Sequence, residues 1–342
     1  MPAVSVFFTG ATGLQGASVL QLICKNPKYD ITALVRSEEK AKKVRELAGV
    51  KTLVGSLEDA ELMTSTAAKH DVVVQIADIF NLPGTAALLA GAKRRFEVTG
   101  RAPIHIHTSG TGIWADLGAA GNAPSGKITK DNDHDLTAHF NGLPHNAPAT
   151  AVVEAGKAGY VKTYTVYPPT VWGAPSGPFF ESGLAHVGSI QLPLSIKTSI
   201  ARGQGGIVGD GLNVWNHAHI ADVADFFALL LSKAVDGFAP SGPFDGHYIV
   251  ENGEYQYKKF AQTYTKALHA KGKSASPEPT KFEDQEFQAI GFLFILGTNA
   301  TCEGPRARSL GWKPKYTTDD FYAWIPREVD AAIAGTLAGG AY

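Results

Sequence analysis

The sequence predicts an α/β protein with a doubly wound parallel sheet and a smaller C-terminal subdomain. Short apolar segments rich in β-branched residues recur at regular intervals in the first half of the 342-residue chain. Segments with apolar residues at helical spacing separate them. The second half is less regular and contains Pro/Gly-rich stretches such as GAPSGPFFESG. Alternating strands and helices imply right-handed crossovers, and these produce a parallel sheet that is covered on both faces.

The expected elements follow the chain in order. Strands are predicted at 4–8, 31–35, 50–55, 71–78, 103–110, 162–173 and 248–251. Helices are predicted at 16–25, 38–47, 60–69, 84–99, 152–159, 255–270 and 281–297. Residues 115–150 are rich in Gly, Ala, Asn, Asp and Pro and predict a long loop. Long loops at the carboxyl ends of parallel strands usually carry function.

Composition excludes several classes of protein. Apolar residues make up 44% of the chain, charged residues 18%, and the net charge is −1, so neither a nucleic acid nor a membrane is expected as a partner. The two cysteines, Cys24 and Cys302, are too few for a disulfide framework. A strand that begins at residue 4 leaves no room for a targeting segment, and we expect a cytoplasmic protein.

One acidic segment resembles a metal loop but does not satisfy its requirements. Asp131, Asp133 and Asp135 have the spacing of a calcium loop. Leu136 and Gly142 stand where that loop needs Gly and Glu. We interpret the segment as a solvated acidic loop and expect no metal site.

The segment TGATGLQG predicts a phosphate-binding turn, because it follows a strand and opens a helix. Gly10 permits a tight turn, Gly13 lets the backbone approach a pyrophosphate, and Gly16 lets helix and strand pack closely. The helix N-terminus offers free N–H groups to the phosphates, and further contacts are expected from Thr12, Leu14 and Gln15. The turn predicts a Rossmann-type dinucleotide-binding domain at 1–175 with 213–245. Residues 176–212 with 246–342 would form the substrate-binding subdomain.

The end of the second strand favours NADP(H) over NAD(H). The sequence there is Ala33-Leu34-Val35-Arg36-Ser37, and no carboxylate occurs before Glu38. An acidic residue at this position would bind the ribose 2′-hydroxyl of NAD, whereas arginine accommodates a 2′-phosphate. Arg36 and Ser37 are therefore candidate cofactor contacts.

Several motifs together resemble the extended and atypical short-chain dehydrogenase/reductases. They are TGATGLQG, HTSG after the fifth strand, VYPPTVWG after the sixth, HAHIADVADFFALLL and ARSLGWKPKYTTDDF. Within that superfamily, GATGLQGAS is similar to the NmrA-like group, and the tail is similar to fungal epimerase/dehydratase-type members. The resemblance implies additional cofactor contacts by Ala77, Thr108, Pro168, Thr170 and Val171.

The resemblance also implies a catalytic set that this chain lacks in part. Ser109 would polarise the substrate oxygen. A tyrosine expected near Asn146 and a lysine expected near Thr150 are both missing from PHNAPATAVVE. The pair Tyr255 and Lys259 has the right spacing but lies in the C-terminal half, and we interpret it as coincidence.

His145 is our candidate for the missing acid, because an imidazole titrates in the useful range. The alternative is an ordinary histidine on a surface loop. His105 and His107 alternate along one strand and are interpreted as packed or cofactor-side residues. Aromatic residues could form an apolar wall for a substrate, namely Trp114, Tyr167, Trp172, Phe179 and Trp215.

The sequence thus predicts an NADP(H)-dependent oxidoreductase that acts on a small organic carbonyl, alcohol or enone. Two alternatives stay open. One is an NmrA-like redox sensor that binds NADP without turnover, and the absent Tyr–Lys pair favours it. The other is an epimerase or isomerase that uses the cofactor transiently. Helices beside the sheet could also form a homodimer interface.

Overall fold

The computed structural model describes residues 2–336 and centres on one parallel sheet of seven strands. Their order across the sheet is β11-β7-β5-β4-β1-β2-β3. The bounds are β1 Val4–Thr9, β2 Tyr29–Val35, β3 Lys51–Val54, β4 Val72–Gln75, β5 Ile104–Thr108, β7 Lys162–Tyr167 and β11 His247–Ile249. The order reverses direction beside β1, and ligands of such sheets bind where the strand order reverses, at the carboxyl ends.

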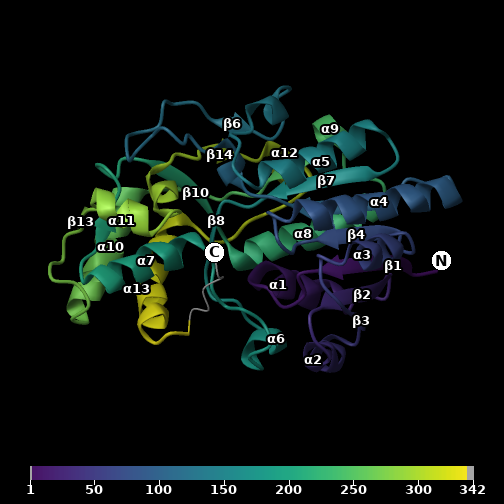
Figure 1. Cartoon of the computed structure of the whole chain (residues 1–342), viewed down its shortest axis with the longest axis horizontal. Helices are drawn as coiled ribbons and strands as arrows, with labels where there is room; N and C mark the ends of the chain where they lie inside the picture. The colour runs from purple at the N-terminus through teal and green to yellow at the C-terminus, as the bar shows by residue number, and fades with distance from the viewer. Residues whose placement is uncertain (1, 337–342) are drawn as a thin grey trace.

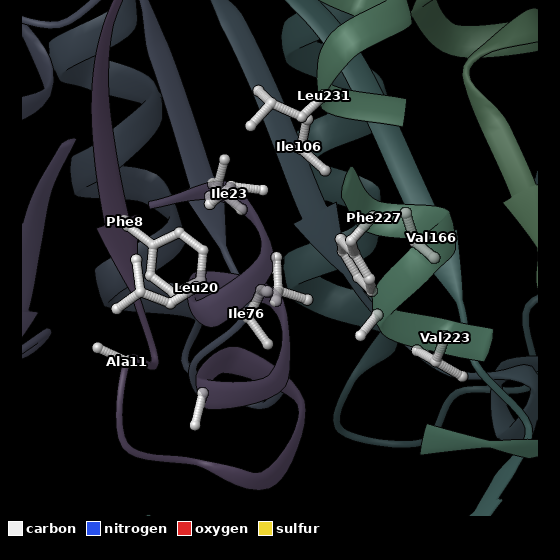
Figure 2. Close-up of a cluster of buried hydrophobic side chains, with 14 of the residues drawn as sticks. Phe8, Ala11, Leu20, Ile23, Ile76, Ile106, Val166, Val223, Phe227 and Leu231 are labelled. Carbon is white, nitrogen blue, oxygen red and sulfur yellow. The ribbon is translucent and has the colours of Figure 1, made fainter. Parts of the chain in front are cut away.

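Helices cover both faces of this sheet, as the sequence predicts (Figure 1). Side chains at even positions, such as Val6, Phe8 and Ile106, pack with α1 (Leu14–Ile23) and α8 (Ile220–Val235). Figure 2 shows this core, with Leu20 of α1 and Phe227 of α8 directed toward the strands. The opposite face packs on the remaining helices, which are α3 (Ala60–Ala67), α4 (Leu82–Thr99) and α5 (Asn146–Lys157). Because both faces are covered, the central strands β4 and β5 are buried at nearly every position, and their polar residues, such as Gln75 and His107, are buried too.

A second, smaller sheet lies beside the first, at the left of Figure 1. It has the order β12-β10-β8, with bounds β8 Thr170–Trp172, β10 Val214–His219 and β12 Glu254–Gln256. Its apolar core includes residues of α7 (Gln191–Arg202), α10 (Tyr257–Ala270) and α13 (Thr318–Ile333). The smaller elements are α2 Glu38–Ala48, α6 Pro178–Glu181, α9 Gly242–Asp245, α11 Asp284–Ala289, α12 Pro305–Ser309, β6 Thr129–Lys130, β9 Gly206–Ile207, β13 Thr280–Lys281, β14 Cys302–Glu303, and the 3₁₀ turns η1 Thr111–Trp114, η2 Leu136–His139 and η3 Leu293–Gly297.

The structure departs from the sequence-based expectations at several places, one of which is the strand expected at 162–173, divided into β7 of the main sheet and β8 of the small sheet. Strand β11, expected in the C-terminal subdomain, is the seventh strand of the main sheet, and β10, expected in the first domain, belongs to the small sheet. The helix expected at 281–297 is interrupted and divides into α11 and η3. Helix α5 begins at Asn146, inside the expected loop, so the positions of the missing tyrosine and lysine lie in its first turn.

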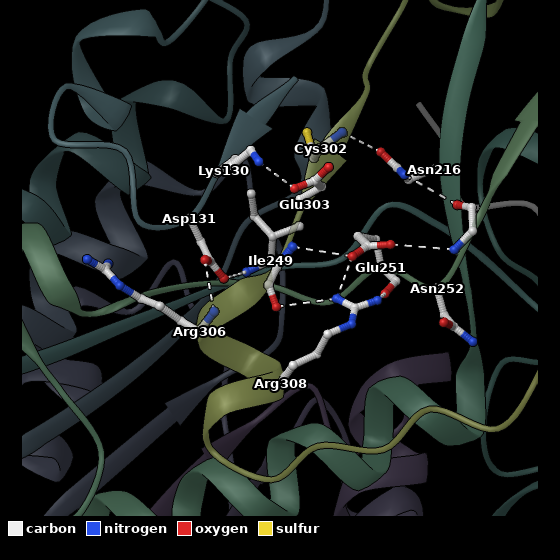
Figure 3. A network of polar contacts seen from close by, with 12 residues as sticks. Lys130, Asp131, Asn216, Ile249, Glu251, Asn252, Cys302, Glu303, Arg306 and Arg308 are labelled. Atoms are coloured by element: carbon white, nitrogen blue, oxygen red, sulfur yellow. Dashed lines mark hydrogen bonds and ion pairs between the residues drawn. The ribbon is translucent and has the colours of Figure 1, made fainter. Parts of the chain in front are cut away.

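Asp131 fastens the C-terminal segment to the edge of the main sheet (Figure 3). Its carboxylate accepts hydrogen bonds from the backbone N–H groups of Ile249 and Arg306, each at 3.1 Å. Glu251 holds the same region by accepting from the guanidinium of Arg308. Asp131 is fully buried, and burial raises the pKa of its carboxyl to about 6. The interpretation of this segment as a solvated loop was therefore wrong at Asp131.

The geometry of Asp131 predicts the effect of an isosteric change. In Asp131→Asn one acceptor oxygen becomes an NH₂ group that faces a backbone N–H, so a buried donor loses its partner. We expect a loss of about 1–3 kcal/mol in the free energy of unfolding, measured by urea denaturation at pH 7.5. The control is Asp135→Asn, since the Asp135 carboxylate is 66% exposed and bonds only to surface His139. Equal stability of the two variants would contradict the role of Asp131.

Candidate cofactor and active site

The glycine turn after β1 is fixed by contacts between backbones. Gly10 adopts φ +88°, and a Cβ on it would lie 2.8 Å from the backbone nitrogen of Ala77. A Cβ on Gly16 would lie 2.0 Å from the carbonyl oxygen of Gly10. Both positions therefore exclude any side chain. Ala77 lies at this turn, as predicted, although its contact with a cofactor stays a prediction.

Gly13 differs from these two glycines, because nothing in the protein requires it. Its φ of −86° is open to any residue, and a Cβ there would meet only the Gly10 carbonyl oxygen, at 3.5 Å. Gly13 is also the N-cap of α1, and no side chain caps this end. The N–H groups of the first helical turn, at Leu14, Gln15 and Gly16, are therefore available to a ligand. This turn fits a pyrophosphate.

Arg36 lies where a cofactor's adenosine ribose would follow from that turn. It is exposed directly after β2, and within residues 2–336 its guanidinium has no ion pair or hydrogen bond. Ser37 caps α2, since its hydroxyl accepts from the backbone N–H of Lys40 at 3.3 Å. Arg36 is thus free to pair with a phosphate, while the Ser37 oxygen already holds the start of a helix.

Buried polar atoms without partners gather at the carboxyl ends of β1 and β5. The chain beyond β5 continues along β7, because the N–H of Ser109 donates to Val166 and that of Thr111 donates to Pro168. The hydroxyl oxygens in this region lack hydrogen-bond partners, and they belong to Thr9, Thr108, Ser109 and Thr111. Buried hydroxyls normally find partners, so such a cluster marks a place where a polar ligand binds. Thr9 and Thr111 were not expected from the sequence, because their burial depends on neighbouring strands.

His145 lies in the same region, at the N-cap of α5. Its ring is 6% exposed, its Nε2 has no partner, and Nε2 would lie 3.7 Å from a Cβ on Gly112. Phe80 packs edge-on against it with ring centroids 5.9 Å apart. The alternative of a surface-loop histidine was wrong. Burial lowers the pKa of His145 to about 4, so the ring is neutral at pH 7.

The structure shows that Tyr255 and Lys259 do not form a catalytic pair. The Tyr255 hydroxyl is buried and contacts the Thr170 hydroxyl at 3.0 Å. Lys259 is exposed, with its Nζ 4.0 Å from the ring centroid of Tyr322. Thr170 also bonds Gln191, at 2.7 Å. The Thr170 hydroxyl, a candidate cofactor contact, is thus occupied within the protein.

The predicted aromatic wall is only partly present. Trp114 is half-buried and packs on Tyr167 with centroids 4.5 Å apart, and a carbon of Trp215 would lie 3.6 Å from a Cβ on Gly112, beside His145. Tyr167 is fully buried, and its hydroxyl forms a hydrogen bond with His247. It therefore packs beneath Trp114 and does not line the wall itself.

Three further wall and cofactor candidates belong to apolar cores. Phe179 is fully buried in the main core and binds the Gln21 side chain of α1 through its N–H, which corrects its assignment to the wall. Val171 is in the same core. Trp172 is buried in the core of the small sheet, and its indole N–H donates to His217 at 3.0 Å.

Comparisons with known proteins agree with this geometry. Residues 10–100 match the family model described as NAD(P)H-binding. The matched residues include the glycine turn and Arg36. The fold is seen in dTDP-glucose 4,6-dehydratase of Bacillus anthracis in complex with NAD, which is 14% identical with a TM-score of 0.64 over 96% of this chain and 97% of that one.

Two relatives in sequence carry names that indicate redox chemistry. The chain is 29% identical to the oxidase ucsJ of an Acremonium species, over 90% of this chain and 92% of the relative. It is 27% identical to a 4-hydroxy-2-methyl-3-oxo-4-farnesyl-3,4-dihydroquinoline-1-oxide ketoreductase of Stigmatella aurantiaca, over 68% of this chain and 65% of the relative. Between residues 2 and 336, no helix has the length and apolar character needed to cross a bilayer.

Gly13 and Gly16 predict different results on substitution by alanine. Gly13→Ala should leave the melting temperature nearly unchanged, since the added Cβ meets only one atom at ordinary contact distance. It should weaken NADPH binding at least tenfold, or about 1.4 kcal/mol, because the Cβ displaces the pyrophosphate. Gly16→Ala should cost about 2 kcal/mol or more in stability through overlap with Gly10. Calorimetric titration and thermal unfolding measure both effects, and unchanged NADPH affinity in Gly13→Ala would refute the phosphate site.

Proposed function

We propose that the protein is an NADP(H)-dependent oxidoreductase that interconverts a small organic alcohol and its carbonyl form. The observation that carries the proposal is the pair of unpartnered polar atoms on Ser109 and on His145, whose ring lies beside Gly112 in the turn that follows Ser109. Both are buried at the carboxyl edge of the sheet, and each has a polar atom without a partner. The glycine turn that fits a pyrophosphate lies on the neighbouring strands. The names of the two relatives, an oxidase and a ketoreductase, support the reaction class.

The residues divide the chemistry between them. Bound at the glycine turn, a nicotinamide would supply the hydride acceptor or donor. Ser109 would hold the substrate oxygen by hydrogen bonding. A neutral His145 accepts a proton more readily than it gives one, so in the oxidation direction it takes the alcohol O–H proton as the C–H hydride leaves. In the reduction of a carbonyl or enone the same proton would return from His145 to oxygen.

Burial of His145 sets the protonation state of its ring. The imidazolium form is disfavoured, since the pKa lies at about 4, and few molecules carry the acidic proton at pH 7. The neutral ring has one nitrogen with a free lone pair, and this nitrogen can accept a proton. We therefore infer that His145 stands ready as the proton acceptor when an alcohol is oxidised with NADP⁺.

The test is turnover followed by nicotinamide absorbance. Purified protein would be offered NADP⁺ with a panel of alcohols, and NADPH with aldehydes, ketones and enones. Ser109→Ala should lower kcat/KM about 100-fold, as loss of a positioned donor does, and should leave NADPH affinity within about twofold. Ser65→Ala, on α3 away from the sheet edge, is the matched control. Tight NADPH binding without turnover of any panel member would favour the redox sensor instead.

Arg36 supports the choice of NADP(H). In Arg36→Gln the cation that would pair with the 2′-phosphate is gone, so the Kd for NADPH should rise about tenfold or more while that for NADH changes less than about twofold. Arg94→Gln, which removes an exposed arginine of α4 that pairs with Glu61, is the control. Equal weakening of both cofactors would show that Arg36 does not read the 2′-phosphate.

A further inference from the structure

Two buried histidines on β5 form a network that the proposed chemistry does not yet use. His105 and His107 lie on one face of the strand, and both rings contact the side chain of Gln75 on β4. Both residues are fully buried. His105 Nδ1 and His107 Nε2 have no hydrogen-bond partner. His107 is the nearer of the two to the carboxyl end of β5, where Ser109 follows.

Hydrogen bonds around Gln75 fix the tautomer of both rings. The Thr85 hydroxyl donates its one proton to the Asn81 carbonyl, at 2.9 Å. Thr85 must therefore accept from the Gln75 amide nitrogen, 2.7 Å away. This places the Gln75 carbonyl oxygen against His105 Nε2 at 3.1 Å and His107 Nδ1 at 3.2 Å. An oxygen only accepts, so both of those ring nitrogens carry hydrogen.

The remaining nitrogens are therefore acceptors. Burial lowers the pKa of His105 to about 4 and that of His107 to about 3, so both rings are neutral at pH 7. A neutral imidazole has one N–H, and in His107 it is committed to Gln75. His107 Nε2 is consequently a buried lone pair in need of a donor, and leaving it unmatched would be costly.

His145 is the donor that the arrangement offers. The His145 ring packs against Phe80, which follows β4, and lies beside Gly112, which follows β5, and these are the two strands that carry Gln75 and His107. The N–H of His105 is already bound to Gln75. His145 Nε2 is itself buried without a partner, at the start of α5, which covers the same face of the sheet as His107.

We propose that His107 is a positioning residue that accepts the Nε2–H of His145, directly or through one bridging water. This bond would fix His145 as the Nε2–H tautomer and leave its Nδ1 as the nitrogen that takes the substrate proton. The relay Thr85–Gln75–His107–His145 would then orient the base as an acceptor behind a catalytic histidine does. The inference rests on the proposed function for the role of His145, but its tautomer claim holds without any substrate.

The test combines nitrogen NMR with kinetics. In ¹⁵N-histidine-labelled full-length protein, two-bond ¹H–¹⁵N correlations identify which ring nitrogen carries hydrogen. We expect Nδ1–H for His107 and Nε2–H for His145, assigned by loss of signals in single variants. In His107→Asn the amide keeps a donor for Gln75 but lacks the Nε2 acceptor, so His145 should become a mixture of tautomers, and kcat should fall at least tenfold with NADPH affinity unchanged.

Matched variants separate this role from packing. His105→Gln keeps a donor for Gln75 and removes only the other unpaired nitrogen, so kcat should stay within about twofold and the His145 tautomer should not change. His107→Gln places a carbonyl oxygen near the Nε2 position and should recover part of the activity lost in His107→Asn.

Three outcomes would overturn the inference: hydrogen on His107 Nε2, a single unaltered His145 tautomer in His107→Asn, or full turnover in that variant. A wild-type protein with the expected tautomers but no turnover would contradict the proposed function and leave the tautomer relay supported.

Discussion

The close approach of three backbone segments organises the rest of the structure. The end of β1, the residue after β4 and the first turn of α1 meet with no space for a Cβ at Gly10 or Gly16. This contact directs α1 back over one face of the sheet and leaves its uncapped N-terminus at the edge where the strand order reverses. Helices cover both faces of the sheet, so the carboxyl edge is where its strands stay open to a ligand. The unpaired hydroxyls of Thr9, Thr108, Ser109 and Thr111 and the unpaired Nε2 of His145 lie there.

The same edge explains how a chain without the superfamily's tyrosine and lysine can retain redox chemistry. The first turn of α5 supplies His145 in that neighbourhood, with Phe80 and the open side of Gly112 around its ring. Asp78 adopts φ +47°, and its carboxylate accepts from the Phe80 N–H, which holds the turn that carries this aromatic ring. An apolar surrounding makes the imidazole neutral. A tyrosine must lose its hydroxyl proton before it acts as a base, and a neighbouring lysine makes that loss easier. A neutral imidazole can act as a base without first losing a proton.

The sequence predicted those features that depend on local pattern. The strands of the main sheet, the phosphate turn and the exposed Arg36 follow from apolar runs and glycine spacing in short windows. Features that depend on distant segments were missed. The alternation of side-chain direction along β7 does not show that Tyr167 faces a packed interior. Phe179 lies in the core because α1 packs against its segment. The burial of His145 depends on the loop before α5, and the place of β11 in the main sheet is set by its pairing with β7.

The central claim is that a nicotinamide dinucleotide lies across the carboxyl edge of the main sheet. A crystal structure of the protein with NADP⁺ tests it most directly. We predict the pyrophosphate on the N–H groups at Leu14 to Gly16, the 2′-phosphate on Arg36, and the nicotinamide ring against Ser109 and His145. A cofactor bound elsewhere, or one whose nicotinamide lies away from Ser109 and His145, would contradict the account.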